Sequence, residues 1–285
     1  MLLGFYSGVS GAIYNEEKLE VTSSNLANVD TAGFRRSLLL HHTRDKNGKT
    51  NRIDSQVRER LPAQYGVRRS GIYKIYDDTG TLKQTNNPFD VAIPPELKNA
   101  FFNVKKIGGN DNETYYTRNG TLSMGLENPS NPDSDTVLYL GGHIALDEAG
   151  SPLLVDATAG DLHIGEDGVV RQGETIVGEI PIFRLNRSPD ANTQTSANLQ
   201  QLLQEGESLF KIPPSLKNEF NPFRLEIGEN GVTRLLAQGM REGSNVNPIN
   251  ELLYMMEASK GHASNLAGIT KQMEGLTKLF QVVRT

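Results

Sequence analysis

The sequence predicts an α+β fold in which a mainly β central domain lies between an N-terminal and a C-terminal amphipathic helix that pair as a coiled coil. Heptad-spaced apolar residues at both ends of the 285-residue chain predict the helices. The middle of the chain contains short β-branched runs separated by turn dipeptides, which are typical of strands. The 28 Gly and 13 Pro residues also favour many turns over a helical bundle.

The first segment, residues 1–34, is predicted to be an assembly helix followed by an exit turn. Its apolar residues recur mostly at steps of three and four: Leu2, Phe5, Val9, Ala12, Leu19 and Leu26. Asp30, Thr31 and Gly33 are stop and turn residues, so the helix is expected to end shortly before them. Gly33 can take a positive φ and redirect the chain, and Phe34 can anchor that turn in an apolar contact.

Residues 35–75 are predicted to be a basic, extended connector. Between residues 35 and 74 there are 11 Lys or Arg and only 3 Asp or Glu, although the whole chain carries a net charge of −5. The segment has little hydrophobic periodicity. It is either an arm that lies on an acidic neighbour or a charged surface loop, and the sequence leaves both interpretations open.

Residues 76–236 are predicted to form an irregular all-β domain. Asn119-Gly120 and Asp167-Gly168 each stand between strand-like runs, so each predicts a β-hairpin. The heptapeptide IPPELKN at Ile93–Asn99 returns as IPPSLKN at Ile212–Asn218. Because the Pro-Pro pair restricts the backbone, we expect the two copies to share a local shape.

The last segment, residues 237–285, is predicted to be the C-terminal assembly helix. Pro248 suits a first helical turn, and about 37 residues of helix from there would be about 55 Å long. The heptad positions are Ile249, Leu252, Met256, Ser259, Ala263, Leu266, Thr270, Met273, Thr277 and Phe280. This seam either packs against other chains or joins the two terminal helices within one monomer, and both alternatives stay open.

The sequence contains no recognisable catalytic or metal-binding constellation. It has no Cys, which excludes disulfides and thiolate ligands. Its five His residues are not spaced as metal ligands, and it lacks both the nucleophile elbow and the phosphate-binding loop. We therefore predict that the protein is not an enzyme and binds no cofactor or metal.

Charge and hydropathy exclude two classes of partner. The pI of about 5.6 argues against a nucleic-acid-binding protein. No apolar run approaches the roughly 20 residues of a membrane-spanning helix, so direct membrane insertion is not expected. The N-terminus lacks the basic region of a secretion signal, so a cleaved signal is not expected either.

Four sequence motifs, in order along the chain, carry a resemblance to a known family. They are SSNLANVDTAGFRR at Ser23–Arg36, TNNPFDVAI at Thr85–Ile93, YTRNG at Tyr116–Gly120 and EGSNVNPINEL at Glu242–Leu252. They resemble the motifs of the bacterial flagellar rod and hook proteins. The likeness covers both ends and most of the middle of the chain.

The resemblance implies a structural subunit of the flagellar basal-body rod, which self-assembles through paired terminal helices into the axial drive shaft for motility. Its implied partners are other copies of the chain, neighbouring rod and hook proteins and the flagellar export apparatus. The implied location is the basal body in the periplasmic space. The implied assembly residues are Asn25, Leu26, Ala27, Asn28, Thr31, Gly33, Phe34, Ser244, Asn245, Val246, Ile249, Leu252, Met256, Leu266, Met273 and Phe280.

The chain departs from the family pattern in three places. PPELKN precedes Ala100 where the family has a Gly-rich turn, and MEASKGHASN replaces a Gln-Arg-x-Tyr-Glu run of the distal rod protein. The centre is also too short for the additional domains of a hook protein. The sequence therefore favours a rod protein, and the F type over the distal G type. The alternatives are a hook or hook-junction protein, or a secreted enzyme or carbohydrate-binding β domain on a helical stalk.

Overall fold

The computed structural model describes residues 2–44, 66–76, 78–108, 113–131, 134–156, 162–186, 196–206, 208–217, 220–228 and 232–283. The chain forms two compact units. The first comprises Met1–Ala27, Ser37–Lys74 and Asn247–Thr285, and the second comprises Asn28–Arg36 and Ile75–Val246. The architecture is α+β, with a helix near each end and a mostly β middle, as the sequence predicts.

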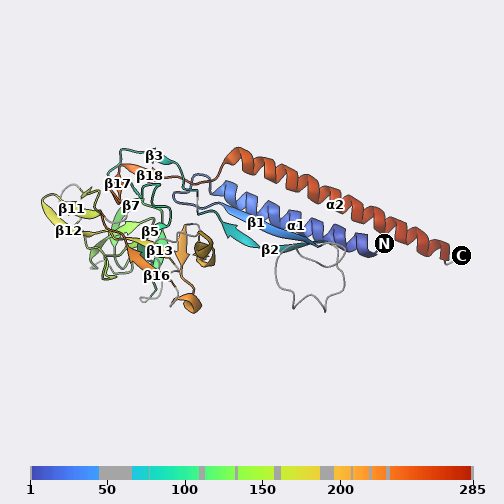
Figure 1. Cartoon of the computed structure of the whole chain (residues 1–285), viewed down its shortest axis with the longest axis horizontal. Coiled ribbons are helices and arrows are strands. Elements are labelled where there is room, and N and C mark those ends of the chain that lie inside the picture. Colours follow the sequence, from blue (N-terminus) through green and yellow to red (C-terminus); the bar gives the residue numbers. More distant parts are fainter. Residues whose placement is uncertain are drawn as a thin grey trace. The chain divides into compact units, whose positions relative to one another are not determined.

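The first unit contains both helices and one hairpin. Helix α1 is Leu2–Ala27 and helix α2 is Pro248–Val283. Figure 1 shows the two helices side by side and running in opposite directions. Strands β1 (Ser37–Arg44) and β2 (Gly66–Lys74) pair antiparallel and contact α1.

The hairpin differs from the predicted extended connector. Ser37 and Leu39 are buried while Leu38 and Leu40 are exposed, so β1 presents alternate side chains to opposite faces. The ring of His41 lies 4.4 Å from that of Tyr14 on α1, measured between centroids. The beginning of the predicted connector therefore pairs with its end, and residues 45–65 lie outside the described residues.

The second unit is built from short strands. One sheet has the order β14-β15-β6-β5-β9-β8-β7, and β13 joins β16 to β5 in the same sheet. The other pairings are β10-β11-β12, β17-β4 and β18-β3. The bounds are β3 Leu82–Gln84, β4 Val91–Ala92, β5 Ala100–Lys105, β6 Tyr115–Thr117, β7 Leu122–Leu126, β8 Thr136–Leu140, β9 His143–Ala145, β10 Leu162–Ile164, β11 Val169–Gln172, β12 Thr175–Glu179, β13 Ile182–Asn186, β14 Leu203–Glu205, β15 Leu209–Lys211, β16 Asn221–Arg224, β17 Ala237–Gln238 and β18 Met240–Glu242. Two short 3₁₀ helices occur at Ser196–Gln201 and Pro214–Leu216.

Strand β5 lies between two apolar clusters, because successive side chains of a strand point to opposite faces. Phe102 and Val104 belong to the larger cluster. Phe101 belongs to a second cluster, where it packs edge-on against Tyr76 and Phe210 at centroid distances of 6.4 and 5.8 Å. The second unit therefore has a core on both sides of its central strand.

One of the two predicted hairpins forms and the other does not. Strands β10 and β11 pair across Asp167-Gly168, as predicted, with φ of 88° at Gly168. The prediction for Asn119-Gly120 is wrong, because β6 pairs with β5 and β15 whereas β7 pairs with β8. The N–H of Val91 donates to the Gly120 carbonyl at 2.9 Å, so β4 holds this turn and the two flanking strands diverge.

The repeated heptapeptide adopts the same turn twice. Leu97 N–H donates to the Pro94 carbonyl at 3.0 Å, and Leu216 N–H donates to the Pro213 carbonyl at 2.9 Å. These residues occupy equivalent positions in the two copies. The shared Pro-Pro pair therefore produces the shared local shape that the sequence predicts.

Candidate functional site

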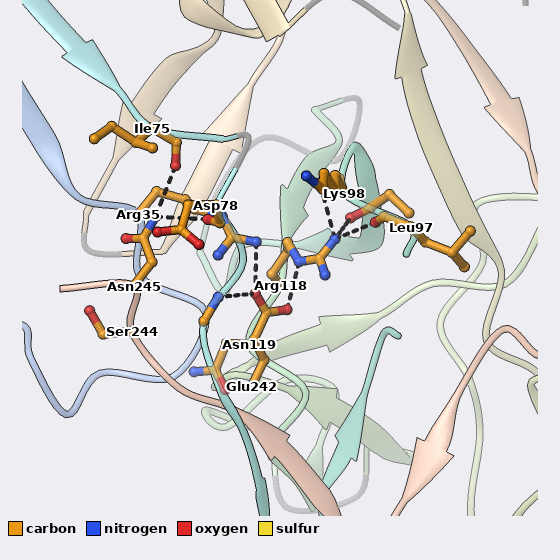
Figure 2. Close-up of polar contacts among 12 residues, drawn as sticks. Arg35, Ile75, Asp78, Leu97, Lys98, Arg118, Asn119, Glu242, Ser244 and Asn245 are labelled. Atoms are coloured by element: carbon orange, nitrogen blue, oxygen red, sulfur yellow. Dashed lines mark hydrogen bonds and ion pairs between the residues drawn. The ribbon is translucent and has the colours of Figure 1, made fainter. Parts of the chain in front are cut away.

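The four motifs, far apart in sequence, meet at strand β18 and the residue before it in the second unit. Figure 2 shows residues of the first, third and fourth motifs at this place. The N–H of Gly33 donates to the Glu242 carbonyl at 3.1 Å, and the N–H of Thr85 donates to the Gly239 carbonyl at 2.9 Å. The guanidinium of Arg118 donates to the Glu242 carboxylate at 2.7 Å. One short segment thus touches the exit turn, the second motif and the third motif together.

We call the place where these motifs meet the junction, and Glu242 lies at its centre. Its Oε1 lies 2.7 Å from Nη2 of Arg35 and accepts a hydrogen bond from the Gly80 N–H at 3.2 Å. Its Oε2 accepts from Nε of Arg118 at 2.7 Å. All three charged side chains are at most 1% exposed. Two guanidinium groups therefore share one carboxylate in the interior, where separating the charges would be costly.

Arg118 also gathers the turn before β5. Its Nη1 donates to the carbonyls of Leu97 at 2.8 Å and Ala100 at 2.7 Å, with a longer bond of 3.3 Å to Lys98. Burial lowers the pKa of Arg118 to about 10, and the Glu242 carboxylate opposes that shift. The guanidinium is therefore still charged at neutral pH, which fits its contacts with four oxygen acceptors.

The exit turn is closed by backbone geometry. Gly33 has φ of 68°, and a Cβ placed on it would lie 2.7 Å from backbone atoms of Arg118 and Asn119. Phe34 is buried, and its N–H donates to the Thr31 carbonyl at 3.3 Å. Thr31 in turn bonds Asn28 through both its main chain and its side chain.

Asn245 ties three stretches of the second unit together. Its Oδ1 accepts from the Arg36 N–H at 2.6 Å. Its Nδ2 donates to the carbonyls of Ile75 at 3.0 Å and Asp78 at 2.8 Å. The main-chain N–H of Asn245 donates to the Phe34 carbonyl at 3.4 Å. The side-chain amide is thus used at both ends, and an Asp in its place would lose the two donated bonds.

Asn25 has the corresponding role in the first unit. Its side-chain amide accepts from the Ser37 N–H and donates to the Ser37 carbonyl, both at 2.8 Å. It also donates to Oε2 of Glu251 in α2 at 3.1 Å. All three residues are buried. Asn25 therefore acts as a pairing partner for the start of β1 and as a link between the helices.

Small and polar residues line the contact between the helices. Gly8 and Gly11 of α1 face Ile269 and Asn265 of α2, with ideal Cβ positions 3.1 and 2.8 Å from those side chains. Lys18 pairs with Glu257 at 2.8 Å further along. The residues of α1 in these contacts are Gly4, Gly8, Gly11, Asn15, Lys18 and Asn25, which are spaced by steps of three, four and seven.

The predicted heptad seam of α2 lies elsewhere. All ten of its positions are exposed: Ile249, Leu252, Met256, Ser259, Ala263, Leu266, Thr270, Met273, Thr277 and Phe280. Ile249 is 68% exposed and Phe280 is 70% exposed. We call Ile249, Leu252, Met256, Leu266, Met273 and Phe280 the apolar stripe. The helix pair therefore uses a different face of α2, and the stripe is uncovered on the single chain.

The remaining predicted assembly residues lie close to the ends of the helices. Leu26 is half-buried and Ala27 is exposed in the last turn of α1. The hydroxyl of Ser244 accepts from the Val246 N–H at 3.2 Å, and Val246 is buried. Asn247 then caps α2, because its Oδ1 accepts from the N–H of Ile249 at 3.0 Å.

The charged centre of the junction is not among the residues that the sequence predicts for assembly. Arg35, Arg118 and Glu242 all lie inside the four motifs, but the predicted set contains none of them. Arg118 is the only charged residue of its motif, but the first motif also contains Asp30 and Arg36 and the fourth also contains Glu251, so charge alone does not single out these three. Pairing Arg118 with Glu242 needs a contact across 124 residues, which local patterns do not encode.

The described residues contain no group of three or more His, Asp or Glu placed to hold a metal ion. No helix among them combines the length and the apolar composition that a membrane span needs. A surface hollow in the second unit is lined by residues that include Asp135, Asp156 and Gln172. The Gln172 side-chain amide accepts from the Asp156 N–H and donates to the Asp156 carbonyl, so both of its polar groups are used within the wall of this hollow.

The comparisons with known proteins agree on one class, an axial structural component of the bacterial flagellum. The profile of the family described as flagella basal body rod protein matches residues 5–35. The flagellar basal-body rod protein FlgG of Buchnera aphidicola is 29% identical over 99% of this chain and 100% of its own length. FlgF of Caulobacter vibrioides is 26% identical over 96% of this chain and 93% of its own length. FlgG of Bacillus subtilis is 27% identical over the full length of both chains.

The chain is thus similar over nearly its whole length to flagellar basal-body rod proteins of both the F and the G type. These findings support a structural subunit of the flagellar rod. Relatives of both types match nearly the whole chain at similar identity, so the preference for the F type stays a prediction.

Proposed function

We propose that the chain polymerises with copies of itself and with neighbouring rod and hook proteins through its terminal helices, as a non-enzymatic part of the axial drive shaft. Its place would be the periplasmic part of the basal body, reached through the flagellar export apparatus. The apolar stripe of α2 is the observation that supports this. Six large apolar side chains at heptad spacing are exposed on one helix, and a stripe of that size normally marks an interaction surface.

The stripe suits a coiled coil with a neighbouring chain. Its steps of three, four, seven and ten residues keep one face of a helix toward a partner over the length of α2. The contact within the chain uses glycines and polar residues such as Asn265 and leaves this face free. The predicted coiled coil is therefore proposed between subunits, in addition to the helix pair of the single chain.

The size of the contact sets how far the stripe alone can stabilise an assembly. Burying one large apolar side chain stabilises by about 1.5–3 kcal/mol. Since the six are already partly covered, their gross contribution is on the order of 5–10 kcal/mol. Association costs roughly 4–15 kcal/mol in lost freedom. The contribution of these six side chains is of the same order as that cost, so further contacts, with the partner's own apolar residues or with additional neighbours, are needed for a stable assembly.

A double variant, Met256→Glu with Leu266→Glu, tests this proposal. Both positions are exposed, so we expect the single chain to keep its fold and its helix content by circular dichroism. The variant should fail to restore swimming, and fail to complete the rod in images of basal bodies, in cells that lack the wild-type gene. The matched control is Ser264→Glu, an exposed position of the same helix outside the stripe. Normal rods with the double variant would refute the proposal.

A further inference from the structure

Residues 237–246 run along the edge of the second unit and close it; we call them the strap. Strand β17 pairs with β4, and β18 pairs with β3. The strap also receives the N–H of Gly33 and fills the junction with the Glu242 side chain. At its end Asn245 binds Arg36. A ten-residue stretch therefore holds the second unit's N-terminal segment against the rest of its fold.

The charges of the junction depend on the strap. The side chains of Arg35 and Arg118 are fully buried, and both pair with the same carboxylate. That carboxylate belongs to Glu242 in the strap. Burying a guanidinium without this carboxylate would carry a desolvation cost that its attraction to Glu242 otherwise offsets. Before the strap arrives, both guanidiniums are better solvated by water, and the native exit turn is disfavoured.

The strap is also distant along the chain from the segments that it binds. Gly33 and Glu242 are joined across 209 residues, and Gly80 and Glu242 across 162. The main sheet forms from closer pairs, since β7 pairs with β8 and β5 with β6, and even its longest pairings, β5 with β13 and β6 with β15, join residues nearer in sequence than Gly80 and Glu242. Contacts that close longer loops are entropically costlier to form. The strap is therefore expected to dock after the sheet.

We propose that the strap docks last and that the Glu242 carboxylate holds it in place, a role that we call the latch. The exit turn then reaches its native geometry only when residues 237–246 are in place. Residue 36 leads into β1, and residue 246 leads into α2. Asn245 brings these two points together within the second unit. Given the proposed rod function, an incomplete chain would not present paired terminal helices, and only a complete subunit would be ready to assemble.

Pulse-labelled hydrogen exchange during refolding of the full chain tests the order. The amides of Leu138 and Val155 report on strand β8 of the sheet and the segment beside it, since Leu138 donates to the Leu153 carbonyl and Val155 donates to the Thr136 carbonyl. The amides of Gly33 and Gly80 report on the strap, since both donate to Glu242. We expect the sheet amides to be protected at least about tenfold faster. Protection of all four at one rate, or of the strap amides first, would overturn the proposal.

Glu242→Gln tests the latch in the folded protein. It keeps the shape of the side chain and removes the charge that Arg35 and Arg118 share. Native-state exchange at Gly33 and Gly80 should accelerate on the order of a hundredfold, while the sheet amides keep their protection. If all amides accelerate together, or none does, Glu242 is not a latch.

The matched control is Glu148→Gln, which removes an exposed carboxylate from its pair with Arg224 in the same unit. Exposed pairs contribute little, so exchange at the strap amides should change less than about twofold. If Glu148→Gln accelerated exchange at the strap amides as much as Glu242→Gln does, the effect of Glu242→Gln would be general destabilisation. That result would overturn the role of Glu242 as the latch. Because these measurements use the monomer, they can fail without affecting the rod assignment, and loss of assembly in the stripe variant would not affect them.

Discussion

Replacing Gly33 with Ala should destabilise the second unit through two separate physical effects. Gly33 has φ of 68°, a left-handed backbone that costs a residue with a Cβ about 1–2 kcal/mol. The added Cβ would also lie 2.7 Å from Arg118 C and Asn119 N and 3.0 Å from the Arg118 oxygen. These are backbone atoms that cannot rotate away, and such overpacking costs about 1–3 kcal/mol more. We expect a total loss of about 2–5 kcal/mol.

Gly173→Ala is the matched control, since it isolates the backbone effect. Gly173 has φ of 61°, and a Cβ there would meet nothing within 4 Å. It lies in the same unit, in the turn between β11 and β12. Its replacement should cost only the conformational term of about 1–2 kcal/mol.

The free energy of unfolding of both variants is measured by urea denaturation of the full chain, followed by circular dichroism. Gly33→Ala should be the less stable of the two by about 1–3 kcal/mol. Equal losses would mean that the exit turn does not approach the Arg118 turn as closely as the structure indicates. The contact between the first and third motifs would then be refuted.

Gly8→Leu should push α1 away from Ile269, because a Cβ at Gly8 would lie 3.1 Å from Ile269 Cγ1. The helix content measured by circular dichroism should therefore fall. Gly268→Leu is the control and should leave the helix content unchanged, since a Cβ at Gly268 would meet no atom within 4 Å. Burial lowers the pKa of Lys74 to about 8. Between that value and about 10.4 the unfolded chain binds more protons. Stability should therefore rise with pH over this window, and Lys74→Met, assayed by urea denaturation, should abolish that rise. Burial raises the pKa of Tyr116 to about 12, so stability should fall from about pH 10 to 12, and Tyr116→Phe should reduce the fall.

Local chemistry was sufficient to predict the elements and several of their ends. Heptad spacing predicted both helices, and turn residues placed the end of α1 within a few positions of Ala27. Asp167-Gly168 predicted its hairpin because a type of turn depends on two neighbouring residues. The repeated Pro-Pro pair predicted a repeated turn for the same reason.

Only the tertiary structure decided which faces and charges meet. Apolar spacing predicted that one side of α2 packs against another helix, but α1 packs on a different side, where the missing side chain of Gly8 leaves room for Ile269. Asn119-Gly120 has the composition of a hairpin turn, yet a hydrogen bond from Val91 directs its strands apart. Arg118 and Glu242 are ordinary charged residues until folding removes water from both, since their value to each other depends on burial and not on their neighbours in the sequence.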